Sequence, residues 1–240
     1  MSMRWNNLST QTMSENFKLD LGANKLAIFS DTHLSDQFDV VQFEFIKGVV
    51  ESVDRVIING DFWDHYESTF NQFVNSEWRK LFPLLKKKKT IYIYGNHDFS
   101  KFSDERVNLF SDQQADECVV KAGQYLLQVK HGHQIASSGD VMFPWLFGNR
   151  LMLGLGSKLQ AIGVNFLGIP FLRVVFWFWI VQFKKYSQQL EENEILVCGH
   201  AHLAELNLKR NYINSGVIRW GLGQYLLVDN GRLEVVKSRY

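Results

Sequence analysis

Histidine is concentrated in a few short segments of this 240-residue chain. Six of the seven histidines lie in four clusters, each directly after an apolar stretch typical of a β-strand: His33, His97, His131, His133, His200 and His202. Carboxylate or amide side chains accompany several of them, and a further aspartate, Asp61, follows another apolar stretch. Imidazole and carboxylate ligands together suit Mn, Fe or Zn ions. The pattern therefore predicts a metal centre built at strand ends.

A carboxylate in such a set can bridge two ions and hold them about 3.5–4 Å apart. Two ions at this spacing can clamp a phosphate group and lower the pKa of a bound water from about 16 towards about 7. Cysteine ligands are not expected, because the two cysteines, Cys118 and Cys198, lie in apolar strand-like runs. We interpret them as small buried residues rather than as a structural zinc site or a disulfide framework, which favours a reducing cytoplasm.

The elements that must position these side chains alternate along the chain. Helical spacing is expected over residues 40–53 and over residues 70–89, with an interruption near Pro83. Strands are expected at five apolar stretches, each of which ends at a polar cluster: Lys25–Phe29, Arg55–Asn59, Thr90–Tyr94, Tyr125–Lys130 and Ile195–Cys198. Shorter strands joined by turns are expected between Tyr212 and Val236. This order predicts an α/β fold, in which sites form at the carboxyl ends of strands.

The composition predicts one folded globular domain. Hydrophobic residues make up 46% and charged residues 21% of the chain, a balance that argues against disorder. A net charge of +1 gives no overall attraction to nucleic acid. The segment from Met1 to Gly22 is polar and lacks the apolar core of a signal peptide. We therefore expect a flexible lead-in over residues 1–24 and a single domain over residues 25–240.

The five clusters resemble, in the same order, the five motifs of the calcineurin-like metallophosphoesterases. They read Asp31-Thr32-His33, Gly60-Asp61-Phe62-Trp63-Asp64, Gly95-Asn96-His97-Asp98, His131-Gly132-His133 and Gly199-His200-Ala201-His202. The resemblance covers roughly residues 25–236. It implies two facing mixed β-sheets flanked by helices, and the activity of a binuclear metal-dependent phosphohydrolase. The metal ligands that it implies form two sets and a bridge: Asp31, His33 and His202; Asn96, His131 and His200; and the bridging Asp61.

Three motif residues would act on the substrate or support those that do. The resemblance implies that His97 lies beside the scissile phosphate, where it stabilises charge or protonates the leaving oxygen. Asp98 would orient His97, as carboxylates behind a functional histidine do. Asp64 would support the loop that carries Asp61.

Three further basic features have less specific roles. His133 could be a metal ligand, but we favour support of its own loop. His65 could face the site, but we favour a surface position. The run Lys86–Lys89 could bind phosphate, although a solvated helix end explains it more simply.

Residues 141–190, between the fourth and fifth motifs, form an insert of unusual composition. They contain no Asp or Glu, carry five Lys or Arg residues, and eleven of their fifty residues are aromatic, against 14% in the whole chain. The insert could be a buried core segment, a transmembrane helix, or an aromatic and basic cap that contacts an anionic membrane or holds an acyl chain. The uncharged run between Arg173 and Gln182 has eight residues, whereas a membrane-spanning helix needs about 20. We favour the hydrophobic helical cap.

A hydrophobic cap inserted at this place resembles the UDP-2,3-diacylglucosamine hydrolases, a branch of the same family. The resemblance implies cleavage of the pyrophosphate of UDP-2,3-diacylglucosamine in lipid A synthesis, with manganese as the usual metal. The Asp-Phe-Trp-Asp element, residues 61–64, and the overall length are also similar. Two positions depart from that branch, because many of its members have Arg in place of His97 and Asp in place of His133.

The leading hypothesis is a metallophosphoesterase with two divalent ions, Mn²⁺ or else Fe or Zn, acting on a lipid-linked phosphate. The protein would be cytoplasmic and peripheral at the inner face of the cell membrane. One alternative is a soluble phosphodiesterase or phosphatase for nucleotides or phosphoproteins, and another is a non-catalytic scaffold. The predicted substrate-binding residues are the first three cationic groups of the cap: Arg150, Lys158 and Arg173.

Overall fold

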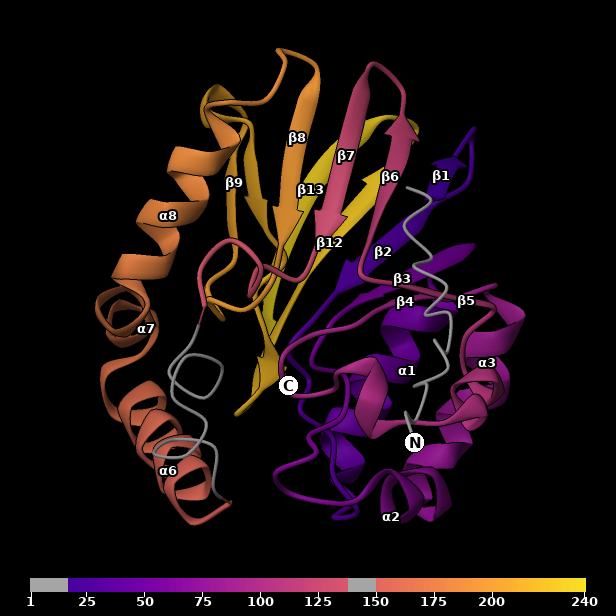
Figure 1. Ribbon diagram of the computed structural model, residues 1–240, viewed down its shortest axis with the longest axis vertical. Coiled ribbons are helices and arrows are strands. Elements are labelled where there is room, and N and C mark those ends of the chain that lie inside the picture. The colour runs from indigo at the N-terminus through magenta and orange to yellow at the C-terminus, as the bar shows by residue number, and fades with distance from the viewer. Residues whose placement is uncertain (1–16, 138–149) are drawn as a thin grey trace, which may run out of the picture.

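Two mixed β-sheets face each other and carry helices on their outer sides (Figure 1). The structure, a computed structural model, describes residues 17–137 and 150–240. One sheet has the strand order β1-β6-β7-β8-β10-β9, and the other has the order β11-β12-β2-β3-β4-β5 with β13 paired to β12. This arrangement confirms the predicted fold class of two facing mixed sheets flanked by helices.

The second sheet supplies three of the predicted site loops. Its parallel strands are β2 (Leu26–Phe29), β3 (Arg55–Asn59), β4 (Ile91–Ile93) and β5 (Gln113–Ala115). Strand β12 (Leu222–Asp229) pairs antiparallel with β2, and its other neighbours are β11 (Ile218–Arg219) and β13 (Arg232–Arg239). The parallel register places the carboxyl ends of β2, β3 and β4 at one edge.

The first sheet supplies the other two loops. Its strands are β1 (Phe17–Asp20), β6 (Glu117–Ala122), β7 (Tyr125–Lys130), β8 (Glu194–Cys198), β9 (Glu205–Asn207) and β10 (Tyr212–Asn214). Strands β7 and β8 run parallel, with Val129 opposite Val197. The loops that follow these two strands therefore leave the sheet side by side.

The hydrophobic core of the described chain consists of three clusters, and the central strands are buried on both faces. Ile57 of β3 belongs to the layer between the sheets, together with Val129 and Val197 of the first sheet. Its neighbours in sequence, Val56 and Ile58, point to the opposite face and pack in the layer beneath the helices. A strand with two apolar faces reads as a continuous apolar run, which is why these strands could be predicted.

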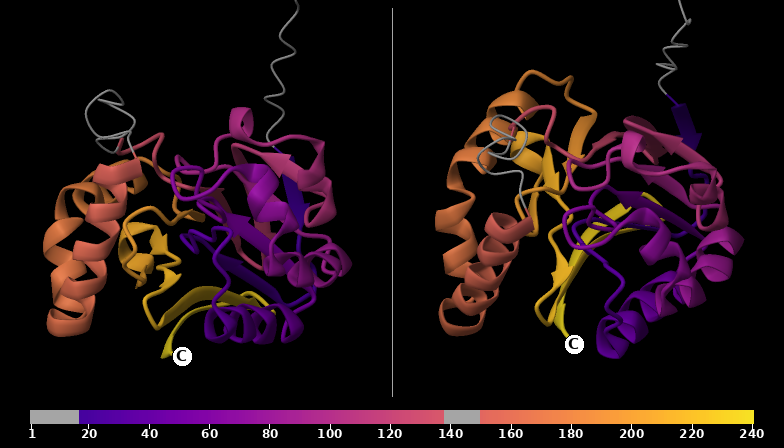
Figure 2. Two further views of the ribbon diagram at one scale, coloured as in Figure 1. Left: turned by 90° about the horizontal axis from the view of Figure 1, so that it is seen from below. Right: turned by 60° about the horizontal axis from the view of Figure 1, so that its bottom comes forward.

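Helices α1 (Val40–Glu51), α2 (Phe70–Asn75) and α3 (Phe82–Lys87) cover the outer side of the second sheet (Figure 2). The helix predicted over residues 70–89 is divided, because Ser76 has an extended backbone and begins the 3₁₀ helix η1 (Glu77–Leu81). Pro83 then lies in the first turn of α3, where its missing N–H costs nothing. Three further 3₁₀ turns occur in loops: Ser100–Phe102, Glu105–Leu109 and Leu208–Arg210.

The described part of the insert consists of α6 (Arg150–Leu167), α7 (Ile169–Val175) and α8 (Trp177–Ser187). These helices lie on the opposite side of the molecule from α1, α2 and α3 (Figure 2). Ile180 and Phe183 of α8 pack with Leu196 of β8 and Tyr212 of β10, so α8 covers the outer side of the first sheet. The predicted helical cap is thus present, and its segment 141–149 lies outside the described residues.

The amino-terminal boundary differs from the prediction. Strand β1 lies inside the expected lead-in over residues 1–24 and pairs in parallel with β6, from Phe17 opposite Cys118 to Asp20 opposite Lys121. A strand of four residues with alternating polar and apolar side chains gives too short a pattern to recognise. Residues 1–16 lie outside the described residues, so the flexibility expected there stays a prediction.

No helix within the described ranges 17–137 and 150–240 combines the length and apolarity that a membrane crossing requires.

The packing of α8 generates a stability prediction. Phe183 is fully buried against the first sheet, so replacing it by Ala should lower the free energy of unfolding by about 3–5 kcal/mol. Phe178, in the same helix, is 58% exposed, and Phe178→Ala should change that free energy by less than about 0.5 kcal/mol. Urea unfolding followed by circular dichroism measures both. Equal values for the two variants would contradict this packing.

Candidate metal centre

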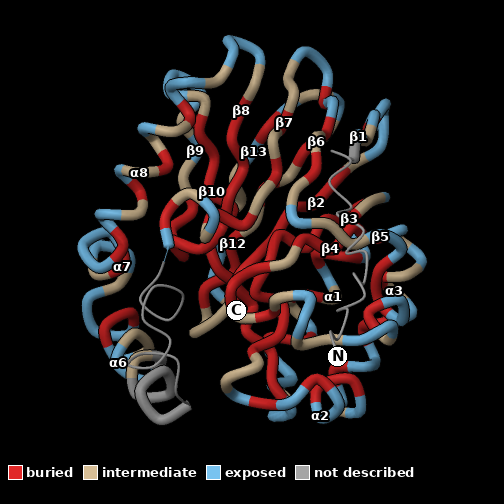
Figure 3. The backbone as a smooth tube through the Cα atoms, in the orientation of Figure 1, coloured by how far each residue is buried: buried red, intermediate tan, exposed pale blue. Residues whose placement is uncertain are grey.

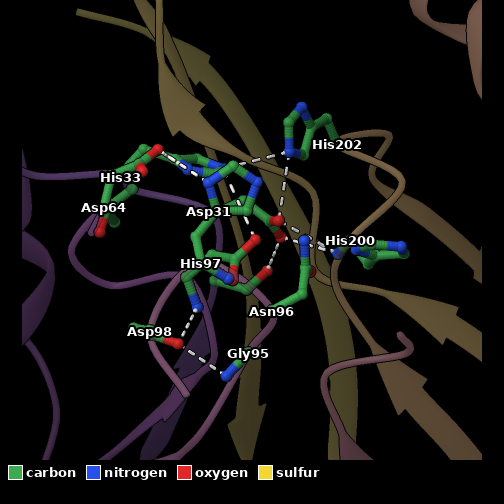
Figure 4. A network of polar contacts seen from close by, with 12 residues as sticks. Asp31, His33, Asp64, Gly95, Asn96, His97, Asp98, His200 and His202 are labelled. Atoms are coloured by element: carbon green, nitrogen blue, oxygen red, sulfur yellow. Dashed lines mark hydrogen bonds and ion pairs between the residues drawn. The ribbon is translucent and has the colours of Figure 1, made fainter. Parts of the chain in front are cut away.

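The carboxyl ends of five strands bring the predicted clusters together in one site (Figure 4). Asp31 and His33 follow β2, Asp61 and Asp64 follow β3, and the cluster at residues 95–98 follows β4. His131 comes directly after β7, and the cluster at residues 199–202 comes directly after β8. The site therefore uses both sheets, three strand ends from one and two from the other.

The first group of possible ligand atoms belongs to Asp31, His33 and His202, which all lie within 4.8 Å of one another. Nε2 of His202 is 3.2 Å from Oδ1 of Asp31 and 3.4 Å from Nε2 of His33. All three residues are buried. These are the residues predicted to hold one metal ion.

The second group belongs to Asp61, His131 and His200, again within 4.8 Å of one another. Nε2 of His131 is 3.2 Å from Oδ2 of Asp61 and 3.2 Å from Oδ1 of Asn96. Oδ1 of Asn96 thus lies beside this group, and its role as a neutral oxygen ligand stays a prediction.

Asp61 lies where the two groups meet. Its Oδ2 is 3.2 Å from Nε2 of His131 in the second group and 3.7 Å from Nε2 of His33 in the first. The side chain is buried, with 1% of the residue exposed. A single oxygen facing both groups has the placement that a bridging carboxylate requires.

Hydrogen bonds on the far side of three imidazoles fix which nitrogen faces the centre. Nδ1 of His33 is 3.0 Å from Oδ2 of Asp64, and Nδ1 of His131 is 2.8 Å from the carbonyl oxygen of Asn59. Nε2 of His200 is 3.0 Å from the carbonyl oxygen of Ala136, so Nδ1 is the nitrogen of His200 that could meet a metal ion. Such outer contacts set the tautomer and the ring orientation of metal-binding histidines.

The backbone at the site is unusual. Nine non-glycine residues of the described chain have a positive φ, and five of them belong to the two groups: Asp31, His33, Asp61, His200 and His202. For these residue types a left-handed conformation is uncommon and costs energy, and it persists where the surrounding structure imposes it. Backbone strain at five residues whose side chains converge is typical of a functional site.

Two glycines allow the chain to approach the carboxylates closely. A Cβ atom on Gly95 would lie 2.2 Å from Oδ1 of Asp61, and one on Gly199 would lie 2.4 Å from Oδ2 of Asp31. Any side chain at either position would displace a carboxylate of the site. Glycine at these motif positions is therefore a steric requirement of the centre.

The role expected for Asp98 is corrected by the structure. The carboxylate that meets Nδ1 of His97, at 2.8 Å, is that of Asp64. Oδ1 of Asp98 accepts hydrogen bonds from the backbone N–H groups of Asp61 and Gly95. Its Oδ2 accepts hydrogen bonds from the backbone N–H of Phe62 and the Tyr92 hydroxyl: Phe62 at 2.7 Å and Tyr92 at 2.6 Å. Asp98 thus holds the two loops together, and Asp64 orients both His33 and His97.

Burial and mutual attraction shape the charges of the centre. Burial by itself would raise the pKa of Asp61, but the imidazoles of His131 and His97 hold it well below the usual range. Burial would lower the pKa of His131, but the charge and hydrogen bond of Asp61 outweigh it and raise the pKa to about 9. Burial and the charge of Asp61 raise the pKa of Asp98 to about 7. A metal ion takes the place of the proton on a ligating imidazole.

Other residues considered in the sequence take structural positions. His65 is half-buried rather than on the surface: its Nδ1 is 2.6 Å from the carbonyl oxygen of His97, and its ring stacks on Phe102 at 3.8 Å. His133 packs edge-on against Phe99 at 5.2 Å. Lys86 pairs with Asp112 at 2.9 Å, at the end of α3.

Two of the three predicted substrate-binding cations have described side chains. Lys158 on α6 and Arg173 on α7 are exposed, and neither forms a hydrogen bond or ion pair within residues 17–137 and 150–240. Arg150 begins α6, and its side chain lies outside the described residues. Their contact with substrate stays a prediction.

Aromatic residues that the motifs did not identify line the site. The indole ring of Trp179 stacks on His200 with 4.3 Å between ring centroids, and Phe176 meets His202 at 5.0 Å. Trp220, after β11, meets His202 at 5.6 Å. The aromatic run at residues 176–179 was visible in the sequence, but nothing in it indicated contact with metal ligands.

The donor set fits a pair of divalent ions. Each group combines imidazole nitrogen with carboxylate oxygen, a mixture that suits Mn, Fe or Zn. Both cysteines are buried and unpaired, and neither belongs to these groups. Nδ1 of His202 is buried without a partner in the described chain, so its ring retains a second polar atom facing the interior.

The sequence model of the calcineurin-like phosphoesterases matches residues 25–205. The chain belongs to this family. The matched range contains every residue of the two groups, including Asp61. The chain is therefore a metal-dependent phosphoesterase, a hydrolase of phosphoric esters, and members of the family use divalent metal ions.

Solved structures with a similar arrangement include a phosphoesterase, YfcE of Escherichia coli, at 18% identity and a TM-score of 0.47, covering 88% of this chain and 92% of that one. A protein of Streptococcus pneumoniae described as a predicted phosphoesterase has 18% identity and a TM-score of 0.43, covering 90% and 92%. Vps29 of Entamoeba histolytica has 14% identity and a TM-score of 0.43, covering 89% and 98%. No curated protein matched the sequence.

The contacts of His97 show how its ring is held beside the metal-ligand groups, while its action on a phosphate stays a prediction. When bound, the metal ions supply Lewis acidity and lower the pKa of water. Asp64 holds the ring of His97 through Nδ1, so Nε2 is the ring nitrogen directed away from Asp64 and able to meet a phosphate oxygen. Oδ1 of Asp61 accepts the backbone N–H of His97 at 2.8 Å, which ties the position of His97 to the bridging carboxylate.

The double contact of Asp64 predicts a large effect of a small substitution. Asp64→Asn should lower the turnover of bis(p-nitrophenyl) phosphate in Mn²⁺ by about 10–100-fold, because an amide cannot hold both imidazoles as a carboxylate does. The exposed Asp36 supplies a matched control, and Asp36→Asn should retain turnover. Turnover of Asp64→Asn within twofold of the wild type would refute this role.

Proposed function

We propose that the protein hydrolyses a lipid-linked phosphate at an anionic membrane surface, with the pyrophosphate of UDP-2,3-diacylglucosamine as the first candidate substrate. The observation that carries this proposal is an exposed apolar surface on the insert, next to the metal centre. We call it the insert surface, and it is formed by side chains of α6, α7 and α8.

The insert surface contains most of the exposed apolar side chains of the described chain. Ten of the fifteen large hydrophobic residues that are exposed lie there: Leu159, Ile162, Phe166, Leu167, Ile169, Val174, Val175, Trp177, Phe178 and Val181. The exposed fraction reaches 84% for Phe166 and 77% for Val174. Figure 3 shows how much of α7 and α8 is exposed, in contrast to the buried strands. A buried core segment would not leave these side chains in water, and large apolar surfaces of this kind mark binding sites.

The charges around the insert surface favour an anionic partner. Lys158, Arg173 and Lys185 are exposed, and residues 141–190 contain no acidic residue that would oppose them. Lys184 does not contribute, because it pairs with Glu205 at 2.7 Å on the side of the sheet. Apolar and aromatic side chains flanked by basic ones suit the interface of a membrane with anionic lipids.

Helix α8 lies between the insert surface and the reaction site. Trp177, Phe178 and Val181 of this helix are exposed, while Phe176 and Trp179 contact the histidines of the centre. The proposal places the apolar part of the substrate on the outer face of α8 and requires its phosphate to reach the metal centre on the inner face. The two faces of α8 support a substrate with a lipid part and a phosphate part.

The metal is proposed to be manganese, by analogy with the branch of the family that the insert resembles. The site itself offers ligands that also suit Fe or Zn. Location at the cytoplasmic face of the membrane agrees with two buried cysteines that remain unpaired.

A soluble phosphodiesterase is the competing function, and one observation favours it. The chain has His97 where many UDP-2,3-diacylglucosamine hydrolases have Arg, and Asp64 holds this His97 in place. The same centre would serve a nucleotide or a phosphoprotein. A small polar substrate, however, would not account for the exposed apolar side chains of the insert surface.

The substrate can be tested by ³¹P NMR. UDP-2,3-diacylglucosamine incubated with the protein and Mn²⁺ should yield UMP and a sugar-lipid phosphate, with no reaction in the presence of a chelator. Asp61→Ala should abolish the reaction, because it removes the carboxylate that faces both ligand groups. Hydrolysis of bis(p-nitrophenyl) phosphate without cleavage of the lipid substrate would reject the lipid and favour the soluble alternative.

Membrane contact predicts a charge effect. The double variant Arg173→Glu/Lys185→Glu should weaken cosedimentation with phosphatidylglycerol vesicles at low salt by at least about tenfold, since each basic residue near such a surface contributes about 1 kcal/mol. Binding to neutral phosphatidylcholine vesicles should change much less.

A control with the same change in net charge is available on the far side of the molecule. Lys87 and Lys89, at the end of α3, are exposed and lie opposite the insert (Figure 1). Lys87→Glu/Lys89→Glu should keep wild-type vesicle binding. Equal loss in both double variants would mean that net charge, and not the insert surface, governs binding.

A further inference from the structure

We infer that Trp179 is a positioning residue for His200, and that through it the insert sets the affinity of the centre for metal. The inference concerns the metal ligands and needs no assumption about the lipid substrate. It rests on three features of the structure: a ring stack, a hydrogen bond, and the anchoring of α8.

The ring stack is the first feature. The indole of Trp179 lies over the imidazole of His200 with a centroid distance of 4.3 Å and an interplanar angle of 21°. His200 is 3% exposed, so the contact is made out of water. A stacked neighbour restricts the ring plane of a histidine, and the plane decides where the lone pair of its ligating nitrogen points.

The hydrogen bond is the second feature. Nε2 of His200 is 3.0 Å from the carbonyl oxygen of Ala136, which is buried in the turn after β7. Ala136 comes just before the insert in sequence, and Trp179 lies near its end. One contact of His200 thus comes from just before the insert, and the other comes from near the carboxyl-terminal end of the insert.

Anchoring of α8 is the third feature. Phe183, one turn after Trp179, is fully buried, and a Cβ on Gly132 would lie 2.9 Å from its ring. Lys184 pairs with Glu205 of β9 at 2.7 Å. The carboxyl-terminal half of α8 is therefore fixed to the sheet, and its amino-terminal half holds the histidine.

The neighbouring ligand shares this dependence. Phe176, at the residue before α8, meets the ring of His202 at 5.0 Å, and Nδ1 of His202 has no hydrogen-bond partner in the described chain. His202 thus lacks the polar outer contact that His33 and His131 have. Aromatic packing from the insert takes the place of that contact for His202, and for His200 it adds to the hydrogen bond with Ala136.

Metal titration of the metal-free protein tests the inference. Trp179→Leu keeps an apolar side chain but has no ring, and it should weaken Co²⁺ binding by about tenfold, as loss of an outer contact does. It should also shift the visible absorption bands of bound Co²⁺, because the angle of the His200 ligand changes. Trp179→Phe retains a ring and should stay within about twofold of the wild type in affinity.

The control variant lies on the same helix. Trp177 is 62% exposed on the other face of α8, so Trp177→Leu should keep the Co²⁺ affinity and spectrum of the wild type. Circular dichroism and urea unfolding check that each variant is folded. If Trp179→Leu does not fold, Trp179→Met replaces it, because Met adapts to irregular gaps.

Wild-type affinity and an unchanged Co²⁺ spectrum in a folded Trp179→Leu or Trp179→Met variant would overturn the inference. So would an equal loss in Trp179→Phe, since a ring would then make no difference. The titration contains no lipid and no phosphate, so a failure of the proposed substrate leaves its result unaffected.

Discussion

The buried carboxylate of Asp61 is the constraint around which the site is built, because a charge removed from water must be compensated on every side. Its Oδ1 accepts the backbone N–H of His97 at 2.8 Å, and its Oδ2 faces Nε2 of His131 at 3.2 Å. Asp98 fixes the same loop by accepting the backbone N–H of Asp61 itself. One buried charge thus ties together the loops that follow β3, β4 and β7. Divalent ions held by these residues would compensate the negative charge of Asp61 more strongly than the imidazoles do.

Holding this carboxylate and its partners requires backbone conformations that the residues would not adopt by themselves. Five site residues have left-handed φ values between 45° and 63°, and each such conformation costs about 1–3 kcal/mol. The strands that precede them counter this cost, since β2 is buried along its whole length and β3 and β8 are buried except at their first residues. Strands that are packed on both faces restrict the backbone conformations that the loops after them can adopt. The apolar core therefore stabilises the strands that hold the site residues in strained backbone conformations.

The same core explains what could be predicted from the sequence. The strands before the site are buried on both faces, so they appear as apolar runs, and the polar clusters stand out at their ends. Contacts between residues distant in sequence were not accessible in this way. Asp98 adjoins His97 in the chain and was assigned to orient it, but that contact belongs to Asp64, which is 33 positions away. Strand β1 was missed because its four residues acquire a structure only by pairing with β6.

Helix α8 shows where a signal was present in the sequence and went unused. Residues at positions i, i+3, i+4 and i+7 share one face of a helix, and in α8 the face of Phe176 and Phe183 is buried while that of Trp177 and Phe178 is exposed. Counting aromatic residues over the whole insert hides this division. A single helix therefore carries an exposed apolar outer face and an inner face in contact with His200 and His202. Under the two proposals, a change in the insert that alters the choice of substrate also acts on His200, unless it is confined to the outer face.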